Sequence, residues 1–97
     1  MAKAMKPREF ASIWDALEQR PEEATNMRLR SELLISLRQR IEAWNTTQAR
    51  AAKRLRITQP RLNDLLRGRI QKFSLDALVA LAEHAGLKIR LEIRAAA

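Results

Sequence analysis

Apolar residues recur every three or four positions near the start of the chain, which is the spacing of one face of an α-helix. The residues that keep this spacing within the segment Glu9–Arg20 are Phe10, Ile13, Trp14 and Leu17. We therefore predict a short amphipathic helix in this segment. Pro21 either closes that helix or occupies the first turn of the next one, where a proline is well tolerated.

A longer apolar stripe leads to Trp44. Met27, Leu34 and Ile41 lie seven positions apart, and Leu37 and Trp44 form a second row with the same interval. Seven residues are close to two helical turns, so both rows fall on one side of a helix. The stripe predicts a helix that ends at Trp44, because the polar sequence that follows it has no such period.

Two short helices are predicted next, over Gln48–Leu55 and Gln59–Arg67, with about three residues between them. Thr47 and Thr58 precede them, and a threonine hydroxyl in this position accepts a hydrogen bond from a free N–H of the first turn. Ile57 is the apolar residue available to fill the corner between the two helices. A pair of short helices joined in this way is typical of a helix-turn-helix.

The last part of the chain changes from a helical period to a period of two. Ser74 is a suitable cap for a helix that ends near Gly86, and we expect a loop over residues 69–73 before it. The apolar residues of this predicted helix are Leu75, Leu78, Leu81, Ala82 and Ala85. Polar and apolar residues then alternate strictly over Lys88–Arg94, which predicts a half-buried β-strand.

The 97-residue chain carries a net charge of +8, and almost all of it lies in one segment. Residues 48–72 contain eight lysines and arginines and a single acid, Asp64. Such a concentration of positive charge favours a polyanion as the partner, either a nucleic acid or an acidic membrane surface. Together with the helix-turn-helix pattern, it favours double-stranded DNA. RNA or an acidic protein stays an alternative, as does a basic surface that only faces solvent.

Composition removes several classes of function. The chain has no cysteine and one histidine, His84, and its acids and histidine show no metal-ligand spacing or catalytic cluster. We expect no enzyme activity, no metal and no cofactor. No apolar run is long enough to span a membrane, and the N-terminus lacks the apolar stretch of a signal peptide. A cytoplasmic protein without membrane contact is therefore expected.

The helix-turn-helix segment resembles the XRE family, the DNA-binding domains of the lambda repressor/Cro type. The matching residues, within roughly residues 33–87, are Thr47-Gln48, Ala51-Ala52-Lys53-Arg54-Leu55, Ile57-Thr58-Gln59, Leu62, Leu65, Arg67-Gly68-Arg69 and Ser74-Leu75-Asp76-Ala77-Leu78. The combination of this segment with an N-terminal arm that contains Phe10 and Trp14-Asp15-Ala16-Leu17, and with a C-terminal strand, is similar to the HigA-like antitoxin branch of the family. Two departures stand out: Arg56 occupies a turn position where the family usually has glycine, and Pro60 replaces a polar residue.

The resemblance implies a set of DNA-contacting residues. Those expected to face the bases are Gln59, Pro60, Arg61, Asn63 and Asp64, and those expected to face phosphates are Gln48, Thr58, Arg67, Arg69 and Lys72. Gln59 is suited to adenine, Arg61 to guanine, and Pro60 to a thymine methyl group. Asp64 either accepts from cytosine or orients an arginine.

The predicted fold is therefore all-α, with four to five helices of the lambda repressor type and one C-terminal strand. We divide the chain into a helical arm (residues 1–30), a DNA-binding domain (31–87) and the strand with its tail (88–97). A lone strand leaves backbone groups unpaired, so we expect a homodimer through Ile89, Leu91 and Ile93. Pairing with residues 1–8 of the same chain is the alternative.

The function expected from these features is sequence-specific DNA binding by a dimeric transcription regulator, a repressor. If the HigA-like resemblance holds, the protein is also the antitoxin of a small toxin and regulates the operon that encodes both. The alternative is a protein-interaction module that neutralises a toxin and binds DNA weakly or without sequence preference.

Overall fold

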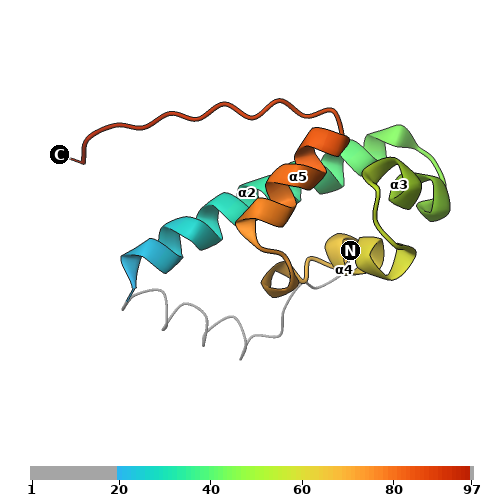
Figure 1. Cartoon of the computed structure of the whole chain (residues 1–97), viewed down its shortest axis with the longest axis horizontal. Coiled ribbons are helices and arrows are strands. Elements are labelled where there is room, and N and C mark those ends of the chain that lie inside the picture. Colours follow the sequence, from blue (N-terminus) through green and yellow to red (C-terminus); the bar gives the residue numbers. More distant parts are fainter. Residues whose placement is uncertain (1–19, 97) are drawn as a thin grey trace.

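The computed structural model describes residues 20–96 (Figure 1). The helix predicted over residues 9–20 lies outside this range except for Arg20, and so do residues 1–8, the alternative partner of the C-terminal segment. The described elements are α2 (Pro21–Trp44), α3 (Gln48–Leu55), α4 (Gln59–Leu66), a 3-10 turn η1 (Ile70–Lys72) and α5 (Leu75–His84).

Helix α2 is the long helix against which the rest of the domain packs. Its first turn contains Pro21 and the acids Glu22 and Glu23, which suit the positive end of a helix. It runs without interruption through residue 30, where we placed the boundary between arm and domain. The helix ends after Trp44, as predicted, where Asn45 adopts a left-handed conformation with φ of 49°.

The three predicted caps are confirmed. The side chains of Thr47, Thr58 and Ser74 accept hydrogen bonds from the backbone N–H three residues later, at 3.2, 3.2 and 3.1 Å. Each cap satisfies one of the N–H groups that a helix leaves unpaired in its first turn. These short-range bonds explain why α3, α4 and α5 begin where the sequence indicates.

The turn between α3 and α4 depends on Arg56. This residue takes the left-handed conformation, with φ of 61° and ψ of 40°, so the residue that replaces the usual glycine carries strain of about 1 kcal/mol. The conformation lets the N–H of Ile57 reach the carbonyl of Ala52 at 3.0 Å. The turn between α3 and α4 therefore forms with an arginine in the left-handed position.

One apolar core joins the helices. Its fully buried large side chains are Phe73, Leu37, Leu55, Leu62, Leu65 and Leu78. Helices α2 and α5 lie side by side along much of this core, while α3 and α4 pack against each other at one end (Figure 1). The segment 69–73, expected to be a plain loop, contains η1 and places Ile70 and Phe73 in the core.

Two arginines of α2 connect distant parts of the domain. Arg40 donates from Nε to the carbonyl of Ala85 at 2.9 Å, just after α5. Arg30 donates to the carbonyls of Ile70 and Phe73 at 3.4 and 3.3 Å. Arg40 thus satisfies a carbonyl group at the end of α5. Arg30 satisfies the carbonyl of Phe73 and adds a second donor to that of Ile70, which already accepts from the N–H of Phe73 at 3.1 Å.

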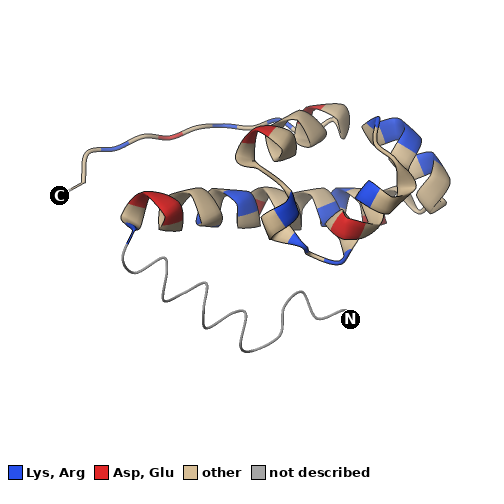
Figure 2. Cartoon of the chain, turned by 60° about the horizontal axis from the view of Figure 1, so that its bottom comes forward, with Lys and Arg blue, Asp and Glu red and all other residues tan. Residues whose placement is uncertain are grey.

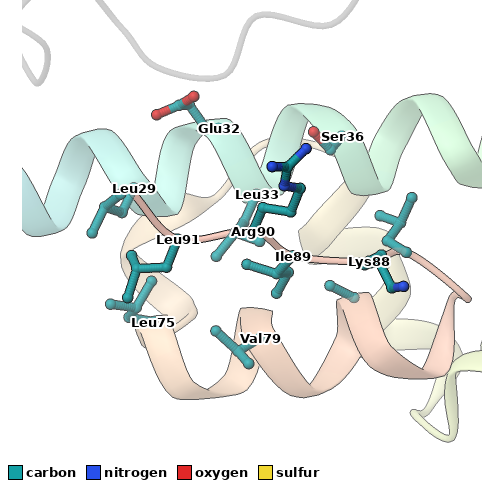
Figure 3. A pocket seen from close by; sticks show the side chains of 12 residues that line it. Leu29, Glu32, Leu33, Ser36, Leu75, Val79, Lys88, Ile89, Arg90 and Leu91 are labelled. Carbon is teal, nitrogen blue, oxygen red and sulfur yellow. The ribbon is translucent and has the colours of Figure 1, made fainter. Parts of the chain in front are cut away.

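The predicted C-terminal strand is not formed. Residues 87–96 are extended (Figure 1), but they make no strand hydrogen bonds within the described part of the chain. Alternating polarity favours an extended backbone, whereas a strand also requires a neighbouring strand. The side chains of Ile89 and Leu91 lie along the groove between α2 and α5 (Figure 3), and Ile93 is 82% exposed.

Candidate nucleic-acid interface

Helix α4 presents one face to the core and the opposite face outward. Leu62 and Leu65 are completely buried, so the 100° rotation per residue turns the opposite side outward. The residues on that outward side are Pro60, Asn63, Asp64 and Arg67. Gln59 and Pro60 are exposed at the first turn, and Thr58 directly before them is exposed as well. The N-terminal turn of α4 is therefore accessible to a ligand.

Helix α3 packs against α4 through its buried residues. Ala51, Ala52 and Leu55 are at most 3% exposed, and small alanine side chains let two helices approach closely. Gln48 is exposed at the start of α3, as a residue that contacts a phosphate must be. The pair α3–α4 therefore has the arrangement predicted for a helix-turn-helix, in which the second helix is held with its first turns outward.

Arg61 is directed away from the outward face of α4. It donates from Nη1 to the carbonyl of Lys72 at 2.7 Å, and its guanidinium carbon lies 3.9 Å from the centroid of the Phe73 ring. In this position Arg61 connects α4 to η1. Contact with a guanine, as the resemblance implies, requires Arg61 to leave both of these partners.

Asp64 forms ion pairs with two of the residues that are expected to contact phosphates. Its carboxylate accepts a hydrogen bond from Arg69 Nη1 at 2.9 Å, and Lys72 Nζ lies 3.7 Å from its second oxygen. The carbonyl of Asp64 also accepts from the N–H of Arg69 at 3.0 Å. In the structure, therefore, the carboxylate of Asp64 is paired with these two cations.

Basic residues surround the outward face of α4. Figure 2 shows them along α3 and around the turn that follows α4. Arg67 is exposed next to Asp64, and the exposed cations outside the predicted site are Arg50, Lys53, Arg54 and Arg56. These four residues belong to the basic segment 48–72. The resemblance to the XRE family does not assign any of them a contact with DNA. Arg54 stacks on Trp44, with 4.1 Å between its guanidinium carbon and the ring centroid.

The single histidine, His84, links two helices. Nδ1 of His84 lies 3.1 Å from the carbonyl of Leu55, so the histidine connects the end of α5 to the end of α3. Within residues 20–96, no group of three or more histidines and acids is arranged to hold a metal ion. None of the helices in this range is long and apolar enough to cross a membrane.

Comparison with known proteins agrees with this geometry. A family model described as "Helix-turn-helix domain" matches residues 16–94 of the chain. No curated protein matches the chain. The matched range extends over α2, α3, α4, η1 and α5, together with most of the extended C-terminal segment.

Proposed function

The chain belongs to this family of helix-turn-helix domains, and we propose that it is a sequence-specific DNA-binding transcription regulator that acts as a repressor. The observation that carries this proposal is the exposed N-terminal turn of α4, which contains Gln59 and Pro60, together with Asn63 on the outward side of the next turn. A helix with its first turns exposed in this way fits the major groove, whose base edges differ for every base pair.

The charge around α4 supports the same proposal. Arg67, Arg69 and Lys72 are exposed beside the outward face of the helix, and the cations of α3 extend the basic surface further. Contacts of this kind neutralise phosphates and release counterions, which makes affinity fall steeply with salt. They set the position of the protein on the duplex, and the α4 face then reads the sequence.

A selection experiment tests this function. We expect duplexes selected from a random pool to bind at least about 1,000-fold more tightly than a random duplex of the same length. We also expect the logarithm of the binding constant to fall linearly with the logarithm of salt concentration, by about 0.9 per phosphate neutralised. Fluorescence anisotropy at several salt concentrations measures both quantities. Equal affinity for selected and random duplexes would contradict sequence-specific binding.

We propose further that the regulator is a homodimer joined through residues 88–94. The apolar side chains of Ile89, Leu91 and Ile93 are 47%, 76% and 82% exposed in the single chain. An antiparallel pair with a second copy would cover them and satisfy the unpaired backbone groups.

Such a dimer presents two copies of α4 to DNA, as required for half-sites about 34 Å apart. A chain that ends at Leu87 is expected to be a monomer, whereas the full chain is expected to be a dimer, because the truncation removes the whole pairing segment. Size-exclusion chromatography with light scattering measures the mass. The variant Lys88→Ser, altered only on the polar side of the segment, serves as the control and is expected to stay dimeric. A truncated chain that stays dimeric would refute this interface.

The antitoxin role is a narrower proposal, supported by the resemblance of the helix-turn-helix segment and of Phe10 and Trp14–Leu17 to the HigA-like branch. In this role the protein binds a small toxin and represses the operon that encodes both proteins. Co-purification with the product of the neighbouring reading frame tests it. If the protein binds such a product but binds all duplexes equally, the alternative of an interaction module is favoured.

A further inference from the structure

We propose that Asp64 is a specificity-determining residue, which holds Arg69 and Lys72 at one phosphate position and lowers the affinity for DNA of unrelated sequence. This inference rests on the proposed function, sequence-specific DNA binding. Asp64 is expected to act through Arg69 and Lys72 and not by contacting DNA itself. Asp64 is the only acid among residues 48–72, yet it stands on the outward side of α4, where a negative charge is least favourable for binding DNA.

The geometry explains what such an acid does there. The side chain of Asp64 is 18% exposed, while those of Arg69 and Lys72 are 43% and 55% exposed. The carboxylate therefore lies beneath the two cations and draws them together, and their outer sides remain accessible. A phosphate that arrives above them meets two cations already in place, so the entropy cost of ordering two long side chains is reduced.

The same carboxylate opposes binding at other positions. It cancels one of the two positive charges of the pair, so the general attraction for the DNA backbone is weaker than the number of cations suggests. A phosphate displaced toward α4 approaches the carboxylate itself and is repelled. Matched DNA gains the oriented pair, while unrelated DNA gains little, so Asp64 increases the difference between the two affinities.

The variant Asp64→Asn tests this proposal, because it removes the charge while preserving the shape of the side chain. For a random duplex we expect affinity to rise about threefold and the salt slope to steepen by up to about 0.9, the value for one additional phosphate contact. For the selected duplex we expect affinity to fall about threefold, because Arg69 and Lys72 lose their orientation. The specificity ratio then falls by about tenfold. Thermal unfolding of the variant confirms that it is folded.

Two further variants separate charge from position. Glu22→Gln adds the same unit of net charge at the start of α2, which Figure 1 shows far from α4, and it is expected to leave the ratio unchanged. Asp64→Glu keeps the charge but moves the carboxylate, so only affinity for the selected duplex is expected to fall. In an Arg69→Ala background, Asp64→Asn is expected to change affinity for the selected duplex much less than in the wild type.

The outcomes distinguish this inference from the function on which it rests. A ratio that falls in Asp64→Asn and is unchanged in Glu22→Gln supports the role of Asp64. A wild-type protein with sequence preference, together with an unchanged ratio in Asp64→Asn, overturns the inference and leaves the DNA-binding function intact. A wild-type protein without sequence preference overturns both.

Discussion

Replacement of Asn63 by alanine is expected to lower affinity for the selected duplex by roughly 10- to 100-fold, the loss of about 1–3 kcal/mol that one good base contact represents. Asn63 lies one turn beyond the start of α4, on the side opposite the buried residues Leu62 and Leu65. Its amide offers a donor and an acceptor together, the pattern that matches the edge of an adenine. Affinity for a random duplex is expected to change little.

Anisotropy titrations with selected and random duplexes at one salt concentration measure this difference. Gln39→Ala is the matched control, because it removes an exposed amide from α2 and is expected to leave both affinities unchanged. Substitution of each base pair in the selected duplex then identifies the position that the wild type distinguishes and Asn63→Ala does not. An equal loss on both duplexes would show that Asn63 contributes no base recognition.

Phe73→Ala is expected to destabilise the domain by about 3–5 kcal/mol, the usual loss for a buried phenylalanine. Phe73 is 1% exposed and is the largest fully buried side chain in residues 20–96. Its ring supports the guanidinium of Arg61, and its carbonyl accepts a hydrogen bond from Arg30. A small domain has about 5–15 kcal/mol of total stability, so the substitution removes a large part of it.

Urea unfolding followed by circular dichroism measures this loss as a change in the transition midpoint. Phe73→Leu, which keeps an apolar side chain in the same space, is expected to lose less than half as much free energy. Because Phe73 also helps to hold η1 beside α4, we expect the leucine variant to bind DNA less tightly than the wild type while it is fully folded. A loss below about 1 kcal/mol in Phe73→Ala would show that η1 contributes little to stability.

The helices were predictable because their boundaries depend on neighbouring residues. A cap such as Thr58 accepts a hydrogen bond from an N–H three residues later. The apolar stripe of α2 lies on one face of the helix, whichever element that face packs against. The left-handed turn at Arg56 follows from the family pattern, since the chain must turn there with or without a glycine. α4 ends at Leu66, one residue before the end that we predicted.

The orientation of the side chains that we expect to contact DNA was only partly predictable. The sequence places Gln59, Pro60 and Asn63 on α4, and the structure leaves the first two exposed. The orientation of Arg61 depends on Phe73, which lies twelve positions later in the chain. No pattern of neighbouring residues predicts the contact between Arg61 and Phe73. The contact forms only because the fold of residues 67–72 brings the Phe73 ring beside α4.

The sequence by itself determined the helix-turn-helix, the basic character of its surroundings and the extended form of the C-terminal segment, because caps, periodicity and charge act over a few residues. Only the tertiary structure decided what each arginine does. Arg30, Arg40 and Arg61 donate to backbone carbonyls of other elements, while Arg69 pairs with Asp64. A guanidinium binds a carbonyl, a carboxylate, an aromatic ring or a phosphate, and the partner within reach depends on how the helices pack.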